Sequence, residues 1–311
     1  MKKENEQYKI ALTIDVEDWY HTPAVTGSDF SFYKDVPEFM KNWNEKYDYL
    51  TKPTIKVLNL LEEFDLKATF FIVADVVDYY PGLVELVAEK GHEISCHGLH
   101  HALNIDSKYK KPVVSVDEFE NRTGLAREKL QNVTGQAIIG YRAPSAYLGE
   151  WMYESLIKLG FKYDSSVNAN SFFSKVDFDT KYIKPNPYFF EFSNEKILEI
   201  PWPYFKLFSL RFPAAGGPLL RFFPSDYIFK GIDYSLQTGD SVFYFHPIDI
   251  SNINLPSLAS KNSKRPFYFI TSGEQTSKKL NKLICLFYKR WTTAKNILDQ
   301  AYNRQISEFS T

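Results

Sequence analysis

The sequence predicts an α/β fold in which a barrel of parallel strands is surrounded by helices. β-Rich runs alternate with helical segments up to about residue 160, and this alternation is typical of parallel sheets with right-handed crossovers. Reactive residues follow the ends of such runs: Asp15, His97, Arg142, Asp164 and His246. In a closed barrel the carboxyl ends of the strands meet at one mouth. We therefore expect a barrel rather than an open doubly wound sheet, because one mouth would hold all five residues.

The expected elements follow in order along the chain. Thr51 and Pro53 begin a helix with apolar residues on one face. Gly91 and Gly160 end two later helices, and Asp117 caps the helix between them. The expected strands are residues 9–15, 68–73, 92–97 and 137–141, and the expected helices are residues 51–64, 83–90, 118–133 and 151–159.

The second half of the chain has a weaker pattern. We expect one domain over residues 1–311, with a loop-rich insertion at about 170–240 that contains a single strand at 197–202. A C-terminal helix is expected at about 274–302, with apolar residues on one side and basic residues on the other. The apolar segment 211–224 either packs on its own barrel, covers a substrate groove or touches a membrane.

Composition excludes some function classes. The formal net charge of -1 argues against a phosphate-backbone partner, so we expect no nucleic acid to bind. The first residues run into a strand without the apolar segment of a signal peptide, which predicts a cytoplasmic protein. Cys96 and Cys285 lie far apart in the sequence, so we expect both to be reduced.

Histidine spacing predicts a metal site. His97 and His101 lie four residues apart, and a helical turn after the third strand would project both imidazoles to one side. Glu17 and Asp18, at the end of the first strand, offer a carboxylate. Two imidazoles and one carboxylate leave a coordination position for water, which is the pattern of hydrolytic zinc centres. A solvated histidine cluster without an ion is the alternative.

Five motifs in register carry a family resemblance. They are Thr13-Ile14-Asp15-Val16-Glu17-Asp18-Trp19, His97-Gly98-Leu99-His100-His101, Gly140-Tyr141-Arg142-Ala143-Pro144, Tyr163-Asp164-Ser165-Ser166 and Phe245-His246-Pro247. Together they resemble the polysaccharide deacetylases, the NodB-homology domains of carbohydrate esterase family four. The D-V-E-D-W opening is similar to a subgroup found with exopolysaccharide and surface-glycan assembly genes. The resemblance implies a distorted (β/α) barrel with fewer than eight strands and a divalent ion, most often Zn2+, with Co2+ or Ni2+ as substitutes.

The resemblance also implies roles at the ion. Asp15 matches the catalytic base, and Arg142 matches the arginine that orients this base and keeps it ionised. His97 and His101 match the metal-binding imidazoles.

Further roles concern the oxyanion and the leaving group. The backbone N–H of Ser145 matches the oxyanion donor, although an aromatic residue is more usual at this position. His246 matches the general acid that protonates the leaving amine, and Asp164 matches the acidic residue that tunes it.

One departure affects the carboxylate ligand. The family opens with adjacent aspartates, whereas Val16 follows Asp15 here. Strand alternation favours Glu17 as ligand, because it lies on the same side as Asp15, but a turn after the strand would present Asp18 instead. In a different alignment Glu17 is the base and Asp15 supports it. We keep Asp15 as the base and both Glu17 and Asp18 as candidate ligands.

The resulting functional hypothesis is a metal-dependent hydrolase that removes the N-acetyl group from an amino sugar in a surface glycan or its precursor. A cytoplasmic enzyme would act on a nucleotide-linked or lipid-linked sugar or a short oligosaccharide, the lipid-linked case with peripheral contact at the inner face of the membrane. One alternative is an allantoinase-like hydrolase of non-sugar amides. Another is a glycan-binding relative without turnover, which would have little need for Asp15, Arg142 and His246 together.

Overall fold

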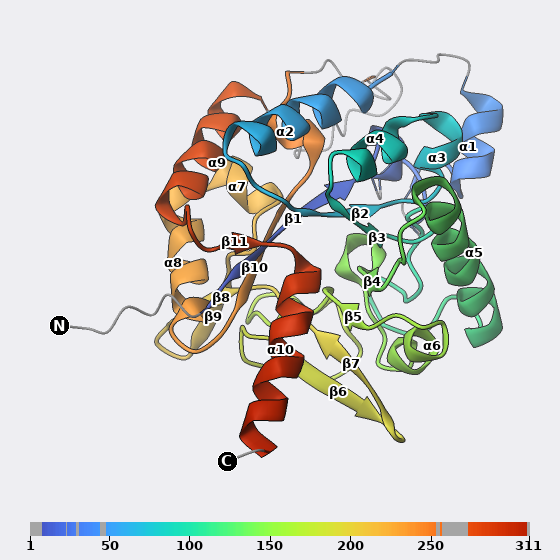
Figure 1. The fold of residues 1–311 in the computed structure, drawn as a ribbon. Helices are drawn as coiled ribbons and strands as arrows, with labels where there is room; N and C mark the ends of the chain where they lie inside the picture. The colour runs from blue at the N-terminus through green and yellow to red at the C-terminus, as the bar shows by residue number, and fades with distance from the viewer. Residues whose placement is uncertain are drawn as a thin grey trace.

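A computed structural model describes residues 8–22, 24–28, 31–43, 48–252, 256 and 273–309, and these residues fold around one curled sheet (Figure 1). Its strands, in spatial order, are β10 (Ser241–Phe245), β1 (Ile10–Val16), β2 (Thr69–Ile72), β3 (Glu93–Cys96), β4 (Gly140–Tyr141), β5 (Tyr163–Asp164), β7 (Glu195–Glu199) and β6 (Tyr188–Phe192). The short β11 (Trp291–Thr292) pairs with the start of β1.

The first seven strands of this order, β10 to β7, are mutually parallel. They confirm the α/β fold with a distorted barrel. The expectation of fewer than eight strands was wrong, because the described sheet has nine strands when β6 and β11 are included. Strand β6 joins β7 in antiparallel orientation and forms the far edge.

Helices surround the outer face of the sheet (Figure 1). Helix α5 packs on β3 and α8 on β10, whereas α10 contacts β1 and its residues Ala294, Ile297 and Leu298 join the buried cluster inside the curl. The helices are α1 (Val36–Asn42), α2 (Thr51–Glu63), α3 (Val76–Tyr79), α4 (Leu83–Glu89), α5 (Val116–Thr134), α6 (Met152–Lys158), α7 (Pro218–Phe222), α8 (Ser225–Leu236), α9 (Glu274–Leu286) and α10 (Ala294–Phe309). The helices and the first three strands expected before residue 160 are present at nearly the expected bounds, whereas the strand expected at 137–141 covers only Gly140–Tyr141.

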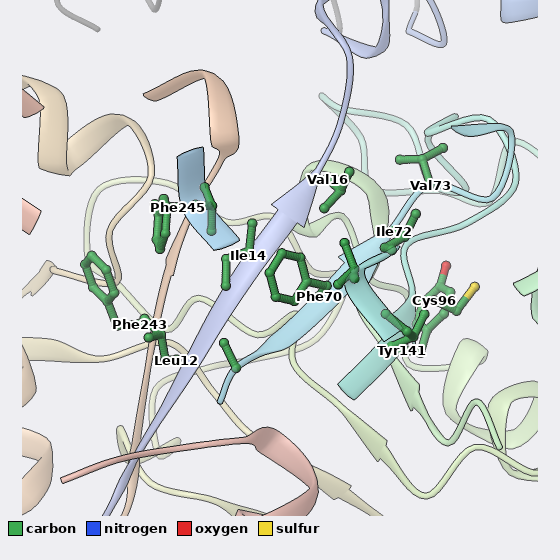
Figure 2. Packing of buried hydrophobic residues seen from close by; sticks show 14 of the residues in the cluster. Leu12, Ile14, Val16, Phe70, Ile72, Val73, Cys96, Tyr141, Phe243 and Phe245 are labelled. Atoms are coloured by element: carbon green, nitrogen blue, oxygen red, sulfur yellow. The ribbon is translucent and has the colours of Figure 1, made fainter. Parts of the chain in front are cut away.

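Alternation along the strands separates two layers of side chains, as a pleated strand requires. On β1, the residues Leu12, Ile14 and Val16 point outward into the main hydrophobic core beneath the helices. Figure 2 shows them beside Phe70 of β2 and Phe243 of β10. The intervening residues of β1 face the barrel interior, and this interior layer contains the reactive groups.

Polar and aromatic residues fill the interior layer. Phe71 of β2, Tyr163 of β5 and Tyr244 of β10 belong to a second buried cluster inside the curl. Within it, the Ser95 hydroxyl lies 2.6 Å from the Tyr163 hydroxyl. Gly140 leaves room for this ring, since a Cβ there would lie 2.0 Å from it. The lower part of the barrel interior is therefore a packed core, and the candidate site lies at the carboxyl ends of the strands.

The open side of the curl is covered by the chain that follows residue 213. Gly216 forms a parallel bridge with Tyr244 of β10, and a Cβ on Gly216, at φ +115°, would meet the Tyr244 carbonyl oxygen at 2.0 Å. Ala214, Ala215 and Leu220 are buried. Most of the apolar 211–224 segment thus packs on its own barrel.

The prediction that residues 170–240 are mostly loop was wrong, because this segment contains several strands and helices. Besides β6 and β7 it contains a hairpin, β8 (Tyr204–Leu207) and β9 (Leu210–Pro213), and the helices α7 and α8. The single strand expected at 197–202 is β7, and its partner β6 is a run of aromatic residues without clear alternation.

The expected single helix at 274–302 was also wrong. Helix α9 ends at Leu286, and Trp291 then pairs with Ile10 of β1 before α10 begins. The Trp291 indole donates a hydrogen bond to the Ile284 carbonyl at 3.0 Å and is buried. A tryptophan that pairs with the first strand interrupts the helical pattern.

Within the described residues, each helix is too short or too polar to span a bilayer. Cys96 is buried and Cys285 is exposed, and both thiols are free.

Candidate functional site

Three side chains converge at the carboxyl end of the sheet. The Glu17 carboxylate lies 3.0 Å from His97 Nε2 and 3.2 Å from His101 Nε2. Glu17 continues the inward alternation of β1, and His97 directly follows β3. These three residues form a group whose ligand atoms all lie within 4.8 Å of one another.

Backbone carbonyls orient both imidazoles. His97 Nδ1 lies 2.8 Å from the Arg142 carbonyl oxygen, and His101 Nδ1 lies 2.8 Å from the His21 carbonyl oxygen. A carbonyl accepts a hydrogen bond, so each Nδ1 carries the proton, and in the neutral ring Nε2 presents a lone pair. Two lone pairs then face the Glu17 carboxylate. A cation between them resolves this repulsion, so the donor set fits a divalent ion held by one oxygen and two nitrogens.

Glu17 is ionised in this arrangement. Burial by itself would raise the pKa of Glu17, but the charges of His101 and His246 outweigh this effect and hold the pKa well below its usual value. An ionised carboxylate is the form that binds a metal.

Asp18 lies outside the group and does not fit the ligand role. Its carboxylate accepts hydrogen bonds from the Trp19 backbone N–H at 2.7 Å and from the Tyr80 hydroxyl. Burial raises the pKa of Asp18 to about 6, and the Tyr80 hydrogen bond only partly offsets this. Asp18 caps the short 3-10 helix at residues 19–21, so its side chain serves the turn after β1.

The segment from His97 to His101 is not the expected helical turn. Gly98 has φ +80° and His101 has φ +54°, and these two left-handed residues fold the segment back on itself. His100 points away and pairs with Asp75 at 3.0 Å. The turn still brings the rings of His97 and His101 to a centroid distance of 4.9 Å.

Asp15 and Arg142 form a buried ion pair beside the group. Arg142 Nη1 lies 2.5 Å from Asp15 Oδ1, and the same nitrogen donates to Thr13 Oγ1 at 3.0 Å. The guanidinium also donates to the carbonyl and hydroxyl oxygens of Ser165, at 2.9 Å each, and lies 4.0 Å from the centroid of the Phe71 ring. Such a rigidly held arginine positions the carboxylate.

The backbone N–H of Ser145 points into the site. Ser145 and Ala146 have φ of +52° and +61°, in a tight turn after β4. The Ser145 N–H lies 3.3 Å from His101 Nε2, on the side where an ion would bind. In the ion-free site this N–H donates a hydrogen bond to His101 Nε2. An ion bound to Nε2 would replace that hydrogen bond and leave the N–H free to donate to an oxygen.

His246 closes the opposite side of the site. Its Nε2 lies 3.5 Å from Glu17 Oε1, and its Nδ1 lies 3.1 Å from Asp249 Oδ2. Asp249 is itself paired with the buried Arg221. Burial by itself would lower the pKa of His246, but the negative charges of Asp249 and Glu17 raise it to about 10. His246 is therefore a cationic proton donor in the ion-free protein.

Asp164 does not contact His246, so its expected tuning role was wrong. Asp164 follows the inward-facing Tyr163 and so points to the outer face of the sheet, where it pairs with Glu199 of β7. Burial raises the pKa of Asp164, and burial together with the Asp164 charge raises the pKa of Glu199. Asp164 accepts a hydrogen bond from the Ser166 hydroxyl, whose oxygen accepts from the Ala143 N–H. It therefore supports the loop that carries Arg142.

The site lies in a cleft of about 260 Å³. Sequence reasoning missed several of its residues. Asp249 follows His246 by three residues, a spacing that suits a short turn and was available as a signal. Four other residues, Lys175, Trp202, Arg221 and Tyr244, line the cleft without a local motif to mark them.

Two family profiles match the chain. A family profile described as polysaccharide deacetylase matches residues 42–163, and one described as a domain of unknown function (DUF3473) matches residues 172–299. The first match includes His97, His101, Arg142 and Ser145.

Curated relatives match less than half of the chain. The peptidoglycan deacetylase of Helicobacter pylori is 27% identical over 144 residues, which are 42% of this chain and 46% of that protein. A peptidoglycan-N-acetylglucosamine deacetylase of Bacillus cereus is 30% identical over 138 residues, 42% of this chain and 48% of that protein. The chain thus spans about half the length of the curated relatives it matches.

Solved structures share the fold. A crystal structure described as a polysaccharide deacetylase from Mycobacterium smegmatis superposes with a TM-score of 0.66 at 18% identity, over 98% of this chain and 93% of that chain. The Puue allantoinase superposes with a TM-score of 0.57 at 14% identity, over 93% of this chain and 88% of that chain. Both show a fold of the NodB type.

We predict that Glu17, not Asp18, holds the ion. Glu17→Ala removes the oxygen ligand and should weaken zinc binding by more than ~100-fold, measured by calorimetry and elemental analysis. Asp18→Asn is the matched control and should bind zinc within a few-fold of the unsubstituted protein. Equal losses in both variants would contradict the assignment.

We also predict that Asp249 sets the proton affinity of His246. Asp249→Asn removes a negative charge next to Nδ1, so the imidazolium loses stabilisation and the pKa of His246 should fall by about 1 to 3 units. NMR titration of the ion-free protein measures this shift. Asp164→Asn should leave the His246 titration unchanged, and a similar shift in that variant would restore the tuning role to Asp164.

Proposed function

We propose that this chain is a metal-dependent hydrolase that removes the N-acetyl group from an amino sugar in a surface glycan or its precursor, and the polysaccharide deacetylase profile that matches residues 42–163 supports this proposal. The observation that carries this proposal is the grouping of Glu17, His97 and His101 beside the Asp15–Arg142 pair. The Asp15 carboxylate, the Glu17 carboxylate and the His246 imidazole also lie within 4.8 Å of one another. A base, an ion site and an acid therefore face one small cleft.

Glu17, His97 and His101 would hold the ion, which we propose to be Zn2+, with Co2+ or Ni2+ as substitutes. When bound, it supplies Lewis-acid chemistry that activates water and polarises the amide carbonyl. A set of one carboxylate and two imidazoles is typical of hydrolytic zinc sites.

Asp15 is the proposed base. Arg142 holds one of its oxygens at 2.5 Å, which fixes the position of the carboxylate in the cleft. Asp15 then accepts the proton of the attacking water. Glu17 is less suited to this task, because its carboxylate faces both imidazoles of the ion group.

Ser145 and His246 complete the reaction. The Ser145 backbone N–H donates to the oxyanion that develops on the amide carbonyl oxygen. His246 lies on the other side of Glu17, carries a proton supported by Asp249, and donates it to the departing amine. The products are acetate and a free amino sugar.

The substrate class follows the names of the relatives. Two of them are named for deacetylating peptidoglycan or its N-acetylglucosamine. We propose an N-acetylated glycan as the substrate here, in the form of a nucleotide-linked or lipid-linked precursor handled at the cytoplasmic side of the membrane. The free thiol of the exposed Cys285 suits a reducing compartment.

A hairpin supports the lipid-linked form. Leu207, Phe208 and Leu210, at the tip of β8–β9, are 53%, 93% and 45% exposed. Lys206 and Arg211 flank them. Apolar residues at a tip with basic neighbours suit an anionic membrane surface. The strands of this hairpin lead back to Trp202 and Pro218 at the cleft, so docking of the tip would bring a lipid-linked sugar toward the site.

We predict acetate release from N-acetylated amino sugars by the zinc-loaded protein. Asp15→Asn should lower kcat by roughly 10²–10⁴-fold, because no group takes the proton of water, and a chelator should abolish turnover. A coupled acetate assay over free, nucleotide-linked and lipid-linked sugars measures both effects. Asp18→Asn is the control with retained turnover. Hydrolysis of hydantoins without acetate release would contradict the proposal and favour the allantoinase-like alternative.

We predict that the hairpin tip binds membranes. The double substitution Leu207→Ser and Phe208→Ser should lower partitioning onto phosphatidylglycerol vesicles at least about tenfold, because the apolar side chains no longer enter the bilayer. Vesicle sedimentation measures this. Tyr109→Ser, an exposed aromatic in another loop, should have no effect. Unchanged partitioning of the double variant would contradict membrane docking by this hairpin.

A further inference from the structure

One wall of the cleft carries positive charge that the reaction does not use. Lys175 lines the cleft, and its Nζ donates a hydrogen bond to the Ser145 carbonyl oxygen at 2.8 Å. The Leu148 N–H donates to the Lys175 carbonyl at 3.1 Å, which fixes the backbone here. Two amines lie near the Tyr147 ring, with Lys175 Nζ at 5.4 Å and Lys110 Nζ at 5.1 Å from its centroid.

These two amines form no ion pair with a carboxylate among the described residues: the polar partners found for them are the carbonyl oxygens of Ser145 and Ser107. Burial lowers the pKa of Lys175 to about 8, the Glu17 charge opposes this, and Lys110 adds to it. Buried charges in proteins are normally paired. A divalent ion on Glu17 would cancel the nearest negative charge and leave the lysine wall more positive still.

We propose that Lys175 and Lys110, whose amines both lie near the Tyr147 ring, form a subsite for an anionic group, a carboxylate or a phosphate, carried by the N-acetylated sugar. This inference rests on the proposed function, since it places the anion next to the Ser145 amide that receives the acetyl oxygen. The Tyr147 ring lines the cleft beside these amines and adds apolar surface for a sugar ring. The two ammonium groups then select the charged substituent as point charges.

The test compares binding of three probes to the zinc-loaded protein by calorimetry. N-Acetylglucosamine is neutral, its 1-phosphate carries a phosphate, and N-acetylmuramic acid carries a carboxylate. At least one anionic probe should bind about tenfold more tightly than the neutral one. A phosphate preference points to nucleotide- or lipid-linked substrates, and a carboxylate preference points to acidic sugars. No preference for either overturns the proposal.

Substitutions then locate the preference. Lys175→Met should remove it, Lys110→Met should reduce it a few-fold, and Lys175→Arg should keep it. Lys108→Met removes an exposed charge two residues from Lys110 and should change nothing. If Lys175→Met weakens neutral and anionic probes equally, Lys175 only supports the Ser145 turn and the proposal fails. If Lys175→Met does not fold, the proposal is tested by comparing the preference for anionic probes in Lys110→Met with that in Lys108→Met.

Acetate release separates this proposal from the proposed function. If the protein releases acetate from the neutral probe but shows no preference for the anionic probes, the subsite proposal is contradicted and the proposed deacetylase function stands. If the protein prefers an anionic probe through Lys175 and Lys110 but releases acetate from no probe, the subsite proposal stands and the proposed deacetylase function is contradicted.

Discussion

The burial of Arg142 is the constraint on which the rest of the site depends. This guanidinium has no exposed surface, and its side-chain partners come from two other parts of the chain, Thr13 and Asp15 on β1 and Ser165 after β5. Removing one partner of such a buried pair typically costs about 3–5 kcal/mol, because the other charge stays buried. The strands can therefore curl in only one way that satisfies it.

Arg142 also connects the base to the ion group. Its side chain holds Asp15, while its backbone carbonyl accepts from His97 Nδ1 and so selects the tautomer that turns Nε2 toward Glu17. The His21 carbonyl does the same for His101, and the His21 imidazole in turn pairs with the buried Asp75 at 3.0 Å. The reactive groups are thus oriented by fully buried partners. This arrangement keeps the geometry fixed before a substrate arrives.

Charged residues line two opposite sides of the cleft. On one side, Asp249 lies between His246 and the buried Arg221, so its negative charge holds the His246 imidazole in place. On the other side, Lys175 contacts the carbonyl of the same residue whose N–H faces the ion site. An amide substrate would lie between a proton source and a positive wall, which suits a reaction that develops negative charge on oxygen and releases an amine.

The sequence by itself determined the strand ends, the alternation of β1 and the histidine pair, because these depend on local periodicity and spacing. Alternation places Asp15 and Glu17 on the inner face, and this much was predictable. Asp164 lies one residue after an inward-facing tyrosine, so the same alternation would have placed it on the outer face had its register been known. That register depends on pairing with β4 and β7, which is a tertiary contact.

Only the tertiary structure decided the partners that come from distant segments. Asp249 and Arg221 meet because α7 and the turn after β10 pack together, and the Trp291 pairing with β1 divides the C-terminal helix in two. Asp18 offers the same carboxylate group as Glu17. Its carboxylate instead accepts a hydrogen bond from Tyr80, 62 residues away in the sequence, and so does not join the group of Glu17, His97 and His101. Long-range contacts of this kind leave no periodic trace in a single sequence, since the free energy that selects them is gained only when the chain is folded.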